Sequence, residues 1–293
     1  MSQAEGPGPK GFQEIVRQAH SLTWRSETRR CEDCGQEFTL RVATDQDGRD
    51  LPSMTVCDPC DEKRRRATQF SQLKLEAEHA CLEGRSMWVG TLPAGFRLKT
   101  FANFNRALQR RAFEALSTFS FTAGRSLILM SPNLYGVGKT HLACALAHKL
   151  FDEVPPAVVD TRMMVLRFSR QPAIYISERS MLSRIRQTYD RKDRSREAES
   201  EEDIYTGLEA APLLIIDDVG KIRPKELNFL QSVYFEIIDQ RYNDGRPVVM
   251  TTNLSAEELE EHLGGACADR LREMCGGKAG FIIMGGSSYR RHE

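Results

Sequence analysis

The stretch that decides the fold is Ser126–Leu150, SLILMSPNLYGVGKTHLACALAHKL. It begins with an apolar run, continues through a Gly-rich turn that ends in Gly138-Lys139-Thr140, and closes with an amphipathic helix. A strand, a loop, a lysine, a hydroxyl and a helix in this order are typical of a site for the phosphates of a nucleoside triphosphate. We expect loop N–H groups and the helix N-terminus to hold the phosphates, Lys139 to reach the β- and γ-phosphates, and Thr140 to bind Mg²⁺.

One residue departs from the pattern GxxxxGK[ST], because Asn133 stands where the pattern has its first glycine. Asn is the non-glycine residue that best tolerates left-handed backbone angles, so we predict that the turn survives. A chance Gly-rich loop is the alternative, and a matching acidic segment downstream argues against it. The predicted nucleotide-binding residues are Asn133, Gly136, Val137, Gly138, Lys139, Thr140 and His141.

The downstream segment is APLLIIDDVG, residues 211–220, an apolar run that ends in Asp217 and Asp218. Its length and apolar character predict a strand that is buried on both faces. In enzymes with such a phosphate loop, the first acid after the strand holds Mg²⁺, directly or through water. The second acid is then in position to polarise the attacking water. The alternative is that the two carboxylates only cap the following turn.

Four of the eight cysteines form two matched pairs, Cys31-x-x-Cys34 and Cys57-x-x-Cys60. Each pair brings two thiolates together from one tight turn, and two such turns complete a tetrahedral site for zinc. A thioredoxin-like redox pair is the rival interpretation, which two spaced pairs disfavour. A region this small and polar needs the metal to fold. The other four cysteines show no ligand spacing, which indicates packing or surface thiols.

Length, charge and hydropathy limit how the chain can contact DNA, where it is located and how it divides into domains. The chain has 293 residues and a formal net charge of zero, so any contact with DNA has to come from a local patch. It has neither a membrane-length apolar run nor a signal peptide, which predicts a cytoplasmic protein without a membrane partner. We predict a zinc-binding, partner-binding domain with a linker helix over 1–87, and an ATPase domain over 88–293.

Strands that alternate with helices predict a parallel sheet covered by helices on both faces. The expected strands are 127–130, 163–168, 173–176, 213–216 and 248–251. Ser255 and Glu258 form a predicted capping box for one helix. The other expected helices are 12–23, 61–83, 103–119, 181–189 and one that Pro224 opens and 243–245 stops. Residues 1–12 are expected to be disordered, 84–99 to be a linker, and 191–203 to be a mobile charged loop.

Residues from about 88 to 293 resemble the DnaC/IstB-type AAA+ ATPases, a family of bacterial and phage helicase loaders and transposition ATPases. The resemblance rests on segments in the correct order: VGTLPAGFRLKTFANF, GVGKTHLACALA, LLIIDDVG, IIDQRYNDGRPVVMTTNLS, DRLREM and SSYR. It implies an α/β AAA+ P-loop NTPase domain. The small zinc-binding domain is not universal in the family and does not follow from the resemblance.

The resemblance also implies roles that spacing alone does not give. Asn253 would sense the γ-phosphate, and Arg270 would be a finger inserted into a neighbour's nucleotide site. Arg272 is the alternative to Arg270, and a surface ion pair is the plain explanation for either. Arg290 would be a second sensor in the same chain. Asp218 stands where many AAA+ motors have Glu, which implies slow hydrolysis.

The implied function is ATP-dependent loading of a DnaB-type hexameric replicative helicase onto single-stranded DNA in replication initiation. The expected activity is hydrolysis of ATP to ADP and phosphate, stimulated by DNA, in a protein that self-associates through its ATPase domain. Arg184 and Arg186 could follow DNA phosphates or be solvated, and the same holds for Arg64–Arg66. The alternatives are a transposition helper ATPase on duplex DNA and a nucleotide-gated adaptor with weak hydrolysis.

Overall fold

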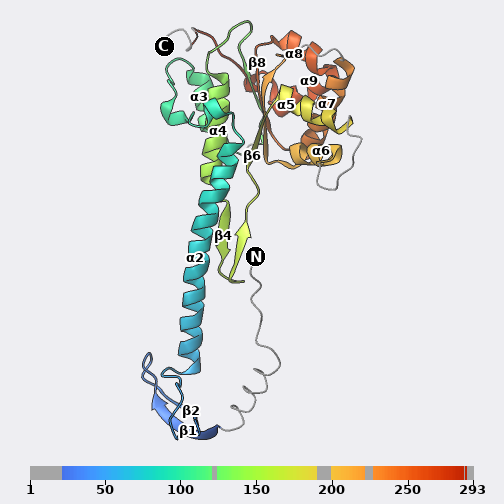
Figure 1. Ribbon diagram of the computed structural model, residues 1–293. Coiled ribbons are helices and arrows are strands. Elements are labelled where there is room, and N and C mark those ends of the chain that lie inside the picture. Colours follow the sequence, from blue (N-terminus) through green and yellow to red (C-terminus); the bar gives the residue numbers. More distant parts are fainter. Residues whose placement is uncertain (1–21, 121–123, 190–198, 222–226, 287, 289–293) are drawn as a thin grey trace. The chain divides into compact units, whose positions relative to one another are not determined.

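The computed structural model describes residues 22–120, 124–189, 199–221, 227–286 and 288, and it consists of two compact units (Figure 1). The smaller unit comprises the chain up to Leu75 with Thr161–Val165, and the larger unit comprises Glu76–Asp160 and Leu166–Glu293. The predicted domain boundary between residues 87 and 88 stays a prediction. The expected disorder of residues 1–12 and most of the expected helix 12–23 lie outside the described residues.

The larger unit is built on a five-stranded sheet whose neighbouring strands all pair in parallel. The strands follow the order β6 (Ala173–Ser177), β7 (Leu213–Val219), β8 (Val248–Thr252), β3 (Leu127–Met130) and β9 (Phe281–Ile283). The predicted parallel sheet is confirmed, although β9 was not predicted. Because the strands are parallel, the carboxyl ends of β3, β7 and β8 meet at one edge, where ligands bind in open α/β sheets.

Helices cover both faces of this sheet, as predicted (Figure 1). One face carries α3 (Arg110–Ser117) and α4 (Lys139–Glu153), and the other carries α5 (Glu178–Tyr189), α6 (Glu201–Ala210), α7 (Leu227–Asn243), α8 (Ala256–Leu263) and α9 (Gly265–Met274). Successive β7 residues enter opposite cores: Leu213 and Ile215 pack with α4, while Leu214 and Ile216 pack with α7. A strand buried on both faces is therefore apolar at every position.

Helix α2 (Asp58–Gly90) is longer than the predicted helix 61–83, and the linker predicted for 84–99 is wrong. Within the larger unit, Trp88 packs against Phe151 of α4 with ring centroids 5.7 Å apart. A Cβ atom at Gly84 would lie 2.6 Å from Cβ of Pro156, so only glycine allows this close approach. Short 3₁₀ helices follow at Ala94–Phe96 and Phe101–Asn103, and the helix predicted over 103–119 forms only over Arg110–Ser117.

The smaller unit contains an antiparallel hairpin of β1 (Thr23–Arg30) and β2 (Glu37–Thr44), which was not predicted. The turn between the two strands carries Cys31 and Cys34, and Cys57 directly precedes α2. The first cysteine pair is therefore presented by a hairpin turn, and the second by the start of a helix.

The remaining local predictions have mixed outcomes. The extra strand expected at 163–168 is β5 (Val165–Phe168), which forms a two-stranded sheet with β4 (Ala157–Asp160). The Ser255 capping box is present, with Ser255 N 2.7 Å from Glu258 Oε2. Residues 201–203 of the expected charged loop are helical, because Ser200 caps α6, while 191–198 and Pro224 lie outside the described residues. None of the described helices is long and apolar enough to cross a membrane.

Candidate nucleotide-binding site and metal centre

The phosphate loop, residues 131–138, connects β3 to α4. Asn133 has φ 55°, Gly136 has φ 75° and Gly138 has φ 97°, so Asn133 adopts the left-handed backbone that was predicted for it. The end of β8 holds this loop in place. Asn133 N donates to the carbonyl oxygen of Asn253 at 3.2 Å, and Asn253 Nδ2 donates to the carbonyl oxygen of Leu134 at 2.5 Å. Asn253 therefore lies beside the phosphate loop.

Lys139 and Thr140 are the first two residues of α4, at the helix N-terminus that faces the sheet edge. The Lys139 side chain is buried and donates from Nζ to Oγ of Ser131. Thr140 Oγ1 lies 3.1 Å from each carboxylate oxygen of Asp217 at the end of β7. A hydroxyl beside a carboxylate is a donor set that suits Mg²⁺, which prefers oxygen ligands. The structure thus brings together the phosphate-loop segment and the acid-ended strand β7, which lie far apart in the sequence.

Asp217 is almost fully buried, at 3 % exposure, and is surrounded by hydroxyl groups. Besides Thr140, it accepts hydrogen bonds from Tyr175 of β6 and Thr251 of β8, each at 2.5 Å. Burial raises the pKa of Asp217 above its usual range, and the hydroxyl contacts oppose that shift. Burial and the nearby Asp217 charge also raise the pKa of Tyr175, which keeps its proton available for donation. Neither Tyr175 nor Thr251 was among the predicted site residues.

The acid loop, residues 217–220, is irregular and tightly held. The β7–β8 register shifts between Ile216 and Val219, and Asp218 has φ 58°. Asp218 N donates to Oγ1 of Thr251 at 3.0 Å, and Thr252 Oγ1 donates to the carbonyl oxygen of Val219 at 2.7 Å. The Asp218 side chain remains half-exposed and pairs with Lys221 Nζ at 2.8 Å. The second acid is therefore accessible where the first is buried.

A cleft of about 1920 Å³ lies at this edge of the sheet and is lined by the phosphate loop, Asp217, Asp218 and Asn253. Side chains from 91–108, including Phe96 and Phe104, line it as well. His141 reaches this segment, with Nε2 2.9 Å from the carbonyl oxygen of Thr100, and burial lowers the pKa of its imidazole. The cleft combines apolar walls with convergent polar groups, which is typical of a small-molecule site.

The predicted arginine finger lies apart from the cleft lining. Arg270 Nε pairs with Oδ1 of Asp239 at 2.6 Å, and its guanidinium lies 4.7 Å from the ring centroid of Phe235. The alternative, Arg272, pairs with Glu260 at 3.2 Å. Arg290 lies outside the described residues. The catalytic roles of these arginines stay predictions.

Of Arg184 and Arg186, for which contact with DNA phosphates and plain solvation were both left open, one lies in the cleft lining. Arg184 lines the cleft and pairs with Glu199 at 2.6 Å. Arg186 lies over the ring of Phe229, with Cζ 5.0 Å from the ring centroid. Both side chains thus have protein partners.

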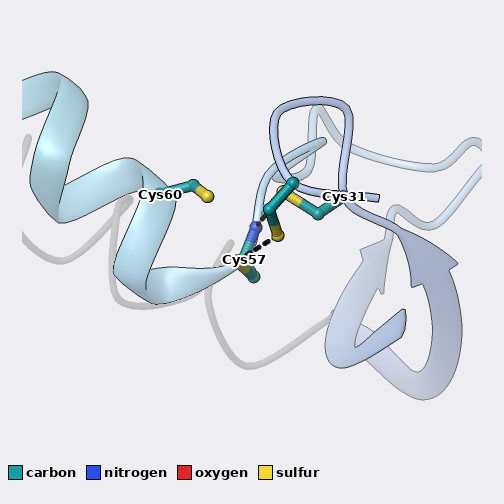
Figure 2. A group of neighbouring side chains, drawn as sticks. Cys31, Cys57 and Cys60 are labelled. Atoms are coloured by element: carbon teal, nitrogen blue, oxygen red, sulfur yellow. Dashed lines mark hydrogen bonds between the residues drawn. The ribbon is translucent and has the colours of Figure 1, made fainter. Parts of the chain in front are cut away.

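The four predicted zinc ligands do converge. The Sγ atoms of Cys31, Cys34, Cys57 and Cys60 all lie within 4.8 Å of one another. Figure 2 shows Cys31 and Cys57 on neighbouring loops and Cys60 on the first turns of α2. Burial opposes ionisation of Cys31, but backbone N–H groups outweigh it and lower the pKa of this thiol to about 6. Four convergent sulfur ligands are a donor set that fits Zn²⁺.

Two of the three arginines beside this centre form ion pairs. Arg64 pairs with Asp33, and Arg65 pairs with Asp61 at 2.7 Å. These contacts favour the interpretation that the basic cluster is a charged helix surface whose side chains bind neighbouring acids.

Sequence comparison relates about half of the chain to known proteins. The replicative helicase loader DnaC of Escherichia coli (strain K12) is 28% identical over 155 residues, which are 53% of this chain and 53% of that protein. The chain is homologous to DnaC helicase loaders. The uncharacterized protein YdaV of the same organism is 29% identical over 143 residues, 49% of this chain and 48% of YdaV. The chain thus spans about half the length of these curated relatives. No family model matches it.

Among solved structures, a crystal structure of the DnaC helicase loader matches with a TM-score of 0.49 and 19% identity, covering 66% of this chain and 100% of that one. A crystal structure of DnaI matches with a TM-score of 0.46 and 16% identity, covering 67% and 93%. The five-stranded parallel sheet with its flanking helices fits the predicted α/β AAA+ P-loop domain, and the cysteine cluster fits the predicted small zinc-binding domain.

Proposed function

We propose that the chain is an ATP-dependent loader that places a DnaB-type hexameric replicative helicase on single-stranded DNA in replication initiation. The observation that carries the proposal is the convergence of Thr140 and Asp217, 3.1 Å apart, beside the buried Lys139. Homology to DnaC over about half the chain supports the choice of helicase loading among the many uses of such a site.

In this proposal the phosphate loop and Lys139 hold the phosphates of ATP, and Thr140 and Asp217 hold Mg²⁺. Magnesium, when bound, would neutralise charge on the β- and γ-phosphates. Asp218 polarises the attacking water, because its carboxylate lines the cleft and stays half-exposed. Asn253 senses the γ-phosphate, since its amide already contacts the phosphate loop. ATP then favours the assembled, DNA-bound state, and hydrolysis releases it.

Self-association is the second part of the proposal. Arg270 would complete the nucleotide site of a neighbouring copy, because a guanidinium stabilises charge on the transferred phosphoryl group. Its position outside its own chain's cleft lining and its support by Asp239 and Phe235 agree with action on a neighbour. Arg290 would act as a second sensor in the same chain. The zinc-bearing unit would bind the helicase.

A single substitution tests the nucleotide site. Lys139→Ala should weaken ATP binding at least ~100-fold in calorimetric titration, because a buried ammonium that contacts phosphate is lost. Lys149→Ala is the matched control, since Lys149 lies on the same helix and pairs with Glu153 at 2.8 Å. We expect the control to bind ATP as the unmodified chain does.

The same preparations separate the loader from its alternatives. ATP turnover, measured with and without single-stranded DNA, should be lost only in Lys139→Ala. Co-elution with a purified DnaB-type hexamer should persist in both variants, because the zinc-bearing unit provides that contact. Unchanged ATP affinity in that variant would reject the site. An unmodified chain that binds ATP yet never hydrolyses it is a nucleotide-gated adaptor, and one that does not retain the helicase is not its loader.

A further inference from the structure

Behind the acid loop lies a fully buried carboxylate, that of Glu178. It is the first residue of α5, directly after β6, and its exposure is 0 %. Its Oε2 accepts a hydrogen bond from the backbone N–H of Gly220 at 3.0 Å. Burying a carboxylate costs free energy unless hydrogen bonds compensate. Its hydrogen-bond partners therefore indicate which part of the structure the carboxylate holds in place. One partner is the backbone of the acid loop itself.

The second oxygen of Glu178 is held from two other helices. Oε1 lies 2.8 Å from the hydroxyl of Tyr234 in α7 and 2.7 Å from Nε2 of His262 in α8. Both side chains are nearly inaccessible: Tyr234 is 0 % exposed and the His262 side chain 10 %. Glu178 thus connects the acid loop to α7 and α8 through one rigid group with satisfied acceptors.

On its other side the acid-loop backbone at Gly220 lies close to the side chain of Leu254. Gly220 has φ 81°, and a Cβ atom there would lie 2.3 Å from Cδ1 of Leu254. Leu254 directly follows Asn253, whose amide contacts the phosphate loop. The loop backbone therefore lies between Glu178 and Leu254, and a displacement of Gly220 moves Asp218, two residues earlier.

We propose that Glu178 is a positioning residue for ATP hydrolysis, which keeps Asp218 directed at the phosphate site by fixing the acid-loop backbone at Gly220. This inference rests on the proposed ATPase function. Glu178 acts through the loop and contacts neither the phosphate loop nor Lys139 in the hydrogen bonds of the described residues. It therefore affects the chemical step and leaves nucleotide affinity alone.

The test compares Glu178→Gln with Glu201→Gln in the full chain. A glutamine at 178 keeps the volume but removes the charge and replaces one acceptor oxygen by an amide N–H₂. The charge-assisted hydrogen bonds that hold the loop are therefore weakened, and the loop shifts. We expect kcat for ATP to fall roughly 10- to 100-fold, the range typical of slightly misplaced catalytic groups. The Kd for ATP should stay within about threefold, and hydrogen exchange of the Gly220 amide should accelerate.

Glu201→Gln removes a comparable tyrosine–carboxylate contact, since Glu201 accepts from the hydroxyl of Tyr189 at 2.5 Å, and should leave kcat unchanged. A folded Glu178→Gln chain with unmodified kcat and unmodified Gly220 exchange would overturn the inference. If that variant does not fold, Glu178→Asp decides, because its shorter side chain keeps the charge but cannot span the same partners. The same loss of kcat at constant Kd supports the inference, and full activity overturns it. If the unmodified chain does not hydrolyse ATP, the proposed function is refuted, and the inference that rests on it is refuted as well.

Discussion

Two non-glycine residues at the site have left-handed backbone angles, Asn133 with φ 55° and Asp218 with φ 58°. Such angles cost free energy for residues other than glycine, and they persist where surrounding contacts enforce them. Here the contacts come from residues at and just after the end of β8: Thr251 binds Asp218 N, and Asn253 binds the phosphate loop. At this scale, the backbone of both loops depends on particular side chains.

This dependence predicts the outcome of two substitutions at residue 133. Asn133→Val places a β-branched residue at a positive φ, which costs about 1–2 kcal/mol relative to a tolerant residue. The Kd for ATP should therefore rise about tenfold, since each 1.4 kcal/mol corresponds to a factor of ten. Asn133→Gly should bind ATP at least as tightly as the unmodified chain. A valine variant with unmodified Kd in calorimetric titration would contradict the argument.

The candidate site residues that were predicted belong to local sequence motifs, whereas those that were missed depend on which strands are neighbours in the sheet. Lys139, Thr140 and Asp217 were predictable, because their chemistry follows from a local pattern of loop, helix and acid-ended strand. Tyr175 and Thr251 were not, because their contact with Asp217 depends on strand order. Only once β7 lies between β6 and β8 do the two hydroxyls flank that carboxylate. The sequence does not specify that neighbourhood.

At the scale of elements, a fully buried arginine of α7 holds together the end of α6 and the starts of β7 and β8 by hydrogen bonds. Arg241 of α7 donates to the carbonyl oxygens of Leu208 at 2.7 Å, Ala211 at 2.9 Å and Pro247 at 2.6 Å. These carbonyls belong to the end of α6, the entry into β7 and the entry into β8. Helix ends leave carbonyls without partners, and one guanidinium supplies donors to several of them.

Arg241→Met should therefore destabilise the larger unit. The methionine fills part of the volume but leaves buried carbonyls unpaired, which we expect to lower the free energy of unfolding by about 3 kcal/mol. Arg272→Met is the control, because Arg272 makes an exposed pair with Glu260, and such pairs contribute about 0–1 kcal/mol. Urea unfolding followed by circular dichroism measures both. Equal midpoints for Arg241→Met and the unmodified chain would refute this role.

Elements with a strong apolar pattern were predicted, and elements fixed by particular contacts were not. The strands β3, β6, β7 and β8 were recognisable because strands buried on both faces are continuous apolar runs. The β1–β2 hairpin is mostly exposed and polar, so alternation did not reveal it. Gly84 suggested a break in α2, yet the helix continues through it. The close approach of Pro156 explains why a residue without Cβ stands at this position.

At the scale of the whole molecule, the two units differ in what stabilises them. The larger unit has extensive cores on both faces of its sheet. In the described part of the smaller unit, the buried cluster consists of Cys31, Val56 and Cys57, with Phe38 and Cys60 packed against it. So small a core supplies little burial free energy, and metal binding is expected to supply the rest.

Removal of zinc should therefore affect one unit only. A chelator, or Cys34→Ser, should abolish metal binding and raise hydrogen exchange throughout 23–44, while the Kd for ATP stays unchanged. Cys81→Ser is the control, because Cys81 lies outside the cluster and contacts the carbonyl oxygen of Ala157 at 3.2 Å. Metal content per chain and peptide-resolved exchange provide the measurements. One zinc retained per Cys34→Ser chain would exclude the four-sulfur site.

The end of β8 has a consequence for how the site responds to its contents. Thr251 and Thr252 hold the acid loop, and Asn253 holds the phosphate loop. Three consecutive residues, the last two of β8 and the one that follows it, thus connect the phosphate loop to the acid loop. A displacement of either loop is therefore transmitted to the other through the end of β8. We expect the occupancy of the phosphate loop and the orientation of Asp218 to change together.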